Sequence, residues 1–95
     1  MSNVKTYYKS KSGETKVSTN FKVREFASKD GADKLLIDND ILPILERFRE
    51  YVEAPVTINS AYRTSSWNKK QGGASNSYHL YGRAFDIQFK KTYKN

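Results

Sequence analysis

Apolar residues in the middle of this sequence recur with two different periods, and this pattern constrains the fold more than any other feature. Between residues 41 and 52 the spacing is three or four residues, as expected for one face of a helix that packs on a core. The residues of this face are Ile41, Leu42, Ile44, Leu45, Phe48 and Val52. We expect a helix over about residues 38–54, with Asp38 or Asp40 as the cap at its start.

After this helix the pattern changes to alternation, which is typical of strands. Residues 55–63 and residues 83–89 each alternate, and both segments are predicted as strands. The apolar face of the second strand consists of Phe85, Ile87 and Phe89. Between the strands, residues 65–71 predict a short helix that ends at the glycine pair 72–73. One main helix, one short helix and a few strands indicate an α+β fold.

Length and composition exclude several classes of protein. The chain has 95 residues, which is enough for one small domain. It has no cysteine, which excludes disulfides, thiol nucleophiles and cysteine-ligated metals. Its one histidine is His79, so a metal site built from this chain alone must be poor in histidine. No apolar stretch approaches ~20 residues, so we expect no membrane span, and no signal peptide is visible.

The formal net charge of +7 is concentrated at the two ends of the chain. Residues 1–22 carry five lysines and one glutamate, and residues 90–95 carry three lysines, whereas residues 23–89 carry nine basic and nine acidic side chains. We interpret residues 1–19 as a basic N-terminal arm, either extended or a weakly ordered strand. A basic nucleic-acid-binding domain stays open as an alternative, with strongly salt-dependent affinity as its signature. Basic ends attract any polyanion, so we expect no specific nucleic acid partner.

A few polar residues combine side-chain types that suit a catalytic or metal site. His79 and Asp86 are seven positions apart, which would place them on opposite faces of one uninterrupted strand. Gly82 permits a bend between them that could bring them together, and a histidine nitrogen with a carboxylate oxygen suits zinc. Arg63 could hold a carboxylate or a developing oxyanion, and Tyr62 could be a stacking platform. The alternatives are solvated polar groups, a surface salt bridge and ordinary packing.

The longer pattern around these residues resembles the D-alanyl-D-alanine carboxypeptidase family of zinc peptidases, and its short phage and prophage endolysin-type members most of all. The resemblance covers roughly residues 20–89. It is carried by a serine–x–tyrosine–arginine pattern at residues 60–63 and an S-x-H-x-x-G-x-A-x-D pattern at residues 77–86. Asn68 and the segment 72–77 lie between the two patterns and also match.

This resemblance implies a fold and a set of site residues. The fold is the small antiparallel α+β domain of the hedgehog and D-Ala-D-Ala peptidase type, here over residues 20–95. His79 and Asp86 match the first two zinc ligands, and Arg63 matches the arginine that contacts substrate or stabilises the tetrahedral intermediate. Ser77 matches a serine close to the site, and with Arg63 and Tyr62 it is expected to bind substrate. The implied reaction is hydrolysis of a peptide bond in peptidoglycan stem peptides, and the implied partner is that peptide.

The chain also departs from the family pattern. Family members carry a third ligand, a histidine, and an acidic general base after the aspartate strand, whereas this sequence ends nine residues after Asp86 with no second histidine. We therefore expect an incomplete zinc site. A C-terminally truncated domain is the favoured explanation; completion by a second chain and an inactive remnant or cell-wall-binding module are the others.

Two further expectations follow. Loss of a strand would leave a sheet edge uncovered, so self-association or strand swapping is expected. Without a signal peptide, the protein is expected to stay in the cytoplasm until a phage-type release to the cell wall.

Overall fold

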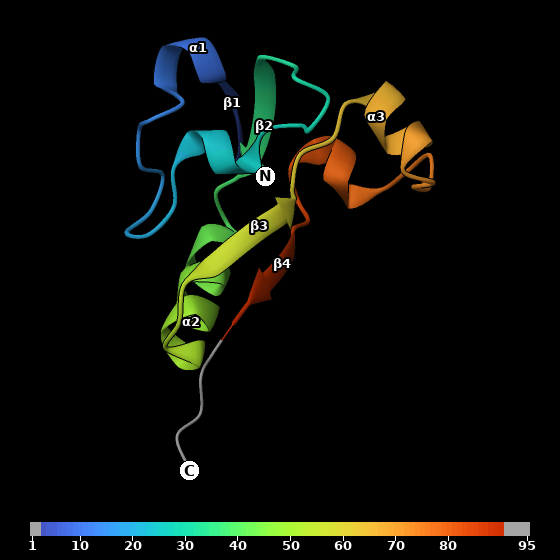
Figure 1. Ribbon diagram of the computed structural model, residues 1–95. Coiled ribbons are helices and arrows are strands. Elements are labelled where there is room, and N and C mark those ends of the chain that lie inside the picture. Colours follow the sequence, from blue (N-terminus) through green and yellow to red (C-terminus); the bar gives the residue numbers. More distant parts are fainter. Residues whose placement is uncertain (1–2, 91–95) are drawn as a thin grey trace.

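The computed structural model describes residues 3–90 of the chain. It contains four strands, three α-helices and two 3₁₀ turns within these residues (Figure 1). In chain order they are β1 (Val4–Tyr8), α1 (Lys9–Ser12), η1 (Val23–Phe26), β2 (Lys34–Asp38), α2 (Leu42–Val52), β3 (Val56–Ser60), α3 (Ser65–Lys70), η2 (Tyr78–Tyr81) and β4 (Asp86–Phe89). The predicted α+β class is confirmed.

The four strands form two separate antiparallel pairs. β1 pairs with β2, with Val4 opposite Asp38 and Tyr8 opposite Lys34. The N-terminal arm was expected to be either extended or a weakly ordered strand. Its first part is a strand, because β1 pairs with β2. The prediction of a boundary at residue 19 stays a prediction.

The second pair, β3 and β4, carries the candidate site residues. Val56 lies opposite Phe89 and Ser60 opposite Asp86, and the register shifts at a bulge between Ile58 and Ser60. The predicted strand at residues 55–63 is longer than the observed one, because β3 ends at Ser60, and Ala61 beyond the bulge is 3% exposed. The predicted strand at residues 83–89 is shorter than expected, since β4 begins at Asp86.

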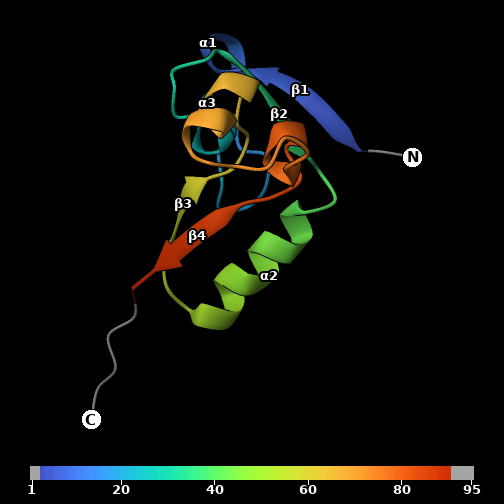
Figure 2. The same ribbon diagram turned by 90° about the vertical axis from the view of Figure 1, so that its right-hand side faces the viewer.

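Helix α2 covers one face of the β3–β4 pair (Figure 2). Phe48 on the helix meets Phe89 on β4 edge to face, with ring centroids 5.5 Å apart. Leu45 is fully buried, but Ile44 is 62% exposed, so its assignment to the apolar face was wrong. A helix turns by about 100° per residue, which places position 44 almost opposite the buried Leu42.

The start of α2 also differs from the prediction. The helix begins at Leu42, within the expected range 38–54, and no side chain caps it. Asp38 does not cap the helix because its carboxylate accepts hydrogen bonds from the Asp40 amide (2.9 Å) and from Arg83 Nε (3.0 Å). Asp38 therefore ties the end of β2 to the segment that follows η2.

The short second helix forms close to its predicted range. α3 spans Ser65–Lys70, and the Thr64 hydroxyl caps it by accepting a hydrogen bond from the Trp67 amide at 3.2 Å. Both ribbon views place α3 and η2 together, beyond the end of the β3–β4 pair where β3 finishes (Figures 1 and 2). Among residues 3–90, no helix has the length and apolar character needed to cross a membrane.

Candidate functional site

His79 and Asp86 meet where β3 ends and β4 begins. His79 Nε2 lies 3.3 Å from Asp86 Oδ2, although six residues separate the two in sequence. Gly82 makes the reversal between them with a left-handed backbone (φ 69°). A Cβ atom at Gly82 would lie 2.2 Å from the Leu36 carbonyl oxygen, so only glycine fits this turn against β2. The bend expected at Gly82 is present and brings the two side chains together.

The imidazole of His79 is held in one orientation. Its Nδ1 lies 2.6 Å from the Ala61 carbonyl oxygen, and its backbone amide donates to the Ser77 hydroxyl. A carbonyl oxygen can only accept, so Nδ1 carries a proton and Nε2 of the neutral ring is an acceptor. This acceptor faces the Asp86 carboxylate, which is also an acceptor. A proton on Nε2, or a cation beside the two acceptors, would stabilise this arrangement.

Arg63 extends the site on the other side of Asp86. Its Nη2 lies 3.8 Å from Asp86 Oδ2, and its side chain is 15% exposed. Its Nε donates to Ser60 Oγ at 3.0 Å, and its Nη1 donates to Asn68 Oδ1 at 3.3 Å. The Arg63 backbone amide also donates to the His79 carbonyl oxygen, which fastens the end of β3 to η2. Thus Arg63, His79 and Asp86, all predicted from sequence, lie in one place.

A cavity of about 480 Å³ opens beside His79. Its described lining consists of Ala74, Asn76, Ser77, Tyr78, His79 and Ala84. Most of these side chains are small or polar. Ser77 and His79 both line this cavity, and the substrate-binding role of Ser77 stays a prediction.

Tyr62 was predicted to bind substrate, with ordinary packing as the alternative. It packs against the core, and the structure does not place it among the described residues that line the cavity beside His79. Burial and the nearby Asp30 carboxylate raise the pKa of its phenol. The packing alternative considered for Tyr62 therefore fits its position, while its substrate-binding role stays a prediction.

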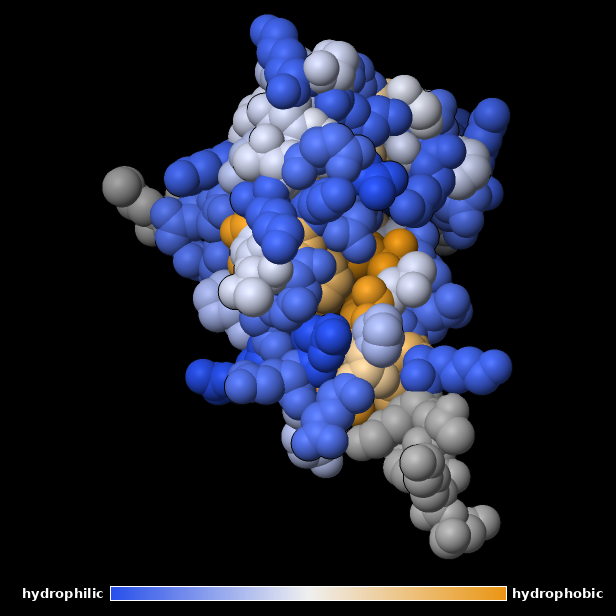
Figure 3. Space-filling view, turned by 60° about the vertical axis from the view of Figure 1, so that its left-hand side comes forward, coloured by the Kyte–Doolittle hydropathy of each residue, from blue (hydrophilic) through white to orange (hydrophobic). Residues whose placement is uncertain are grey.

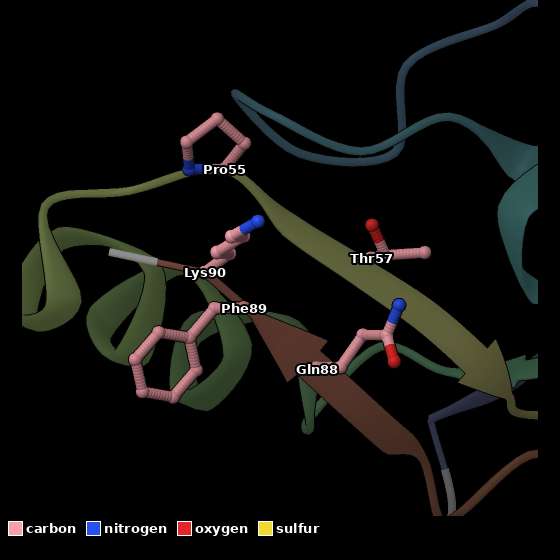
Figure 4. A pocket seen from close by; sticks show the side chains of 5 residues that line it. All are labelled: Pro55, Thr57, Gln88, Phe89 and Lys90. Atoms are coloured by element: carbon pink, nitrogen blue, oxygen red, sulfur yellow. The ribbon is translucent and has the colours of Figure 1, made fainter. Parts of the chain in front are cut away.

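A second cavity, of about 500 Å³, lies at the opposite end of the β3–β4 pair (Figure 4). Its described lining consists of Pro55, Thr57, Gln88, Phe89 and Lys90. None of these lining residues is acidic or a histidine, whereas the cavity at the other end of the pair contains His79.

A model of the Peptidase M15 family matches residues 16–95. The chain belongs to the Peptidase M15 family. The resemblance seen in the sequence is thereby confirmed. The chain is also similar to a zinc D-Ala-D-Ala carboxypeptidase of Streptomyces albus G, with 46% identity over 35 residues. That match covers 37% of this chain and 14% of the relative's length. No solved structure matches the chain.

The metal-binding residues of this M15 domain can be assessed over the part of the chain that the structure describes. Among residues 3–90, no group of three or more histidine, cysteine, aspartate or glutamate side chains could hold a metal ion. His79 and Asp86 can supply two donors, one nitrogen and one oxygen.

Sequence reasoning missed the role of Asn68. Its side chain is 3% exposed and lies between Arg63 and the segment that lines the cavity. The only available signal was its place in the family pattern, because asparagine on a short helix normally faces water.

Proposed function

We propose that this M15 domain is a zinc-dependent peptidase that hydrolyses peptide bonds in peptidoglycan stem peptides. The observation that supports this most is the 3.3 Å separation of His79 Nε2 and Asp86 Oδ2. Zinc binds nitrogen and oxygen ligands at about 2.0–2.2 Å in a tetrahedron, whose ligands lie about 3.3–3.5 Å apart. The two acceptors thus have the spacing of two zinc ligands.

His79 and Asp86 are the residues that would hold the zinc. The hydrogen bond from Nδ1 to the Ala61 carbonyl oxygen fixes the ring with Nε2 directed at the site, as the partner of a metal-binding histidine usually does. When bound, zinc would supply Lewis-acid polarisation of the scissile carbonyl and a lowered pKa of water.

Arg63 would bind and orient the substrate. Its guanidinium is fixed by Ser60 and Asn68, and its remaining nitrogen faces the His79–Asp86 pair. A guanidinium in this place can hold a substrate carboxylate or the negative charge that develops on the carbonyl oxygen. Because it is preorganised, it needs no reorientation during the reaction.

The cavity beside His79 would receive the peptide. Ser77 at its wall keeps η2 in place by accepting the His79 amide, and its small neighbours leave room for alanine-sized side chains. The name of the Streptomyces relative points to a D-Ala-D-Ala terminus. Carboxypeptidase action and endolysin-type endopeptidase action both lie within this proposal.

Zinc binding tests the proposal directly. We expect calorimetry to detect one zinc per chain, and we expect His79→Ala and Asp86→Asn each to weaken binding by roughly tenfold or more. Asp40→Asn is the matched control, because it removes an exposed carboxylate whose hydrogen-bond partner is Asn3, and it should leave zinc affinity unchanged. A peptide ending in D-Ala-D-Ala, followed by chromatography, would then report hydrolysis.

If the folded wild-type chain binds no zinc, the proposal is wrong. A non-catalytic cell-wall-binding module or inactive remnant of the same fold would then be the better description. Zinc binding that survives both substitutions would also contradict it, because the ion would then be held elsewhere.

A further inference from the structure

Asn68 is the one buried polar side chain of α3, and both ends of its amide are used. Its oxygen accepts from Arg63 Nη1 at 3.3 Å, and its nitrogen donates to the Ala74 carbonyl oxygen at 2.8 Å. Its backbone amide donates to the Thr64 carbonyl oxygen, so α3 fixes the position from which the side chain extends. Asn68 therefore links the site arginine to the segment that lines the cavity.

Gly73 closes the space around this amide. A Cβ atom at Gly73 would lie 2.1 Å from Asn68 Oδ1 and 2.7 Å from its Cγ. The Gly73 amide also donates to the Asn68 carbonyl oxygen at 2.9 Å. The backbone at Gly73 thus packs on the Asn68 side chain, and any larger residue there would displace the amide.

Arg63 gains a single orientation from these contacts. Ser60 holds its Nε and Asn68 holds its Nη1, which leaves Nη2 directed towards Asp86. A planar guanidinium held along two of its edges cannot rotate about the Nε–Cζ bond. Removal of the Asn68 contact frees that rotation even though the Ser60 contact remains.

We propose that Asn68, kept in place by Gly73, is the positioning residue of Arg63 and couples its orientation to the cavity wall at Ala74. The proposal rests on the proposed function in one respect, namely that Arg63 contacts the substrate. The contact itself is independent of zinc and of activity.

Nitrogen-15 NMR of the arginine side chains in the metal-free chain tests this. Hindered rotation about Nε–Cζ gives separate Nη1 and Nη2 signals, and Arg63→Lys assigns those of Arg63. We expect separate signals in the wild type and one averaged signal in Asn68→Ala and in Gly73→Ala. Gly72→Ala is the matched control: it strains the same loop at φ 74° but has nothing within 4 Å of the new Cβ, so the signals should stay separate.

Asn68→Asp distinguishes the contact of Asn68 with Arg63 from its contact with the Ala74 carbonyl oxygen. It keeps an oxygen for Arg63 but loses the donor to Ala74, so we expect separate Arg63 signals together with a lower melting temperature. Separate signals in folded Asn68→Ala or Gly73→Ala would overturn the proposal, as would averaged signals in Asn68→Asp. The NMR measurement uses the metal-free chain, so it can be interpreted even if the chain binds no zinc. Averaged Arg63 signals in the wild type would refute the positioning role of Asn68 without bearing on the proposed zinc site.

Discussion

At the scale of single residues, Asp38 is the most buried charged residue among residues 3–90. Its side chain is 4% exposed, whereas that of its partner Arg83 is 50% exposed, and Oδ2 lies 3.0 Å from Arg83 Nε. The Asp38 amide also donates to the Gly82 carbonyl oxygen at 2.9 Å. A buried carboxylate without its cation is costly, so this ion pair holds the turn between His79 and Asp86 against β2.

We therefore predict that Arg83→Met, which keeps an apolar stem of similar length, lowers the free energy of unfolding by about 2 kcal/mol. The double variant with Asp38→Asn should lose less than the sum of the single variants, because it leaves no unpaired buried charge. Urea unfolding of all four proteins measures both quantities. A loss below about 0.5 kcal/mol in Arg83→Met would show that the pair behaves as an ordinary surface salt bridge.

At the scale of elements, Glu46 joins α2 to the loop before η1. Its carboxylate accepts hydrogen bonds from the Ser18 hydroxyl and from both the backbone and side-chain nitrogens of Asn20. A glutamate on the polar side of a helix would ordinarily be a solvated charge. Glu46 is not, because the loop folds back over the helix and brings its donors to the carboxylate.

We predict that Glu46→Gln lowers the free energy of unfolding by about 1 kcal/mol at neutral pH, because an amide is a weaker acceptor and offers one oxygen. Burial alone would raise the pKa of Glu46, but the hydrogen bonds from Ser18 and Asn20 outweigh it and hold the pKa below its usual range. A lowered folded-state pKa stabilises the protein above the unfolded pKa, and this contribution is lost as the pH falls through the folded value.

The difference between wild type and Glu46→Gln should therefore be complete above about pH 5 and shrink below about pH 4. Urea unfolding across this range measures it. Glu50→Gln, one turn further along the same helix, removes the same charge from an exposed position and is the control. Equal losses in the two variants would mean that net charge, not the loop contact, is responsible.

The elements show what sequence can and cannot provide. Periodicity predicted α2 and β3 because their buried faces follow local geometry, and glycine chemistry predicted the bend at Gly82. The bulge before Ser60 and the start of β4 at Asp86 depend on how the two strands pair. A local sequence pattern does not show which strand lies opposite. In the site, the spacing of Arg63, His79 and Asp86 was informative, whereas the contact of Asn68 with Arg63 depends on how α3 packs.

At the scale of the whole molecule, the sheet that carries the candidate site has only two strands, β3 and β4, among the described residues. Within residues 3–90, β4 pairs with β3 alone, so its other edge has no strand beside it. Phe89 on β4 is 44% exposed. On the face of the molecule that Figure 3 shows, hydrophobic side chains gather in one area of an otherwise hydrophilic surface. Two-stranded sheets are marginally stable, and an open edge is a template for another strand.

We predict that the chain self-associates through the open edge of β4. Light scattering after size exclusion should show a mass that rises from 11.0 kDa towards twice that value as the concentration increases. Phe89→Lys places a charge at the edge and should shift the protein towards monomer. Tyr51→Lys, on the exposed face of α2, adds the same charge at a residue that is 83% exposed and should leave association unchanged. A wild-type mass that stays at 11.0 kDa at high concentration would contradict the prediction. Equal shifts towards monomer in Phe89→Lys and Tyr51→Lys would mean that the added charge, and not the edge of β4, controls association.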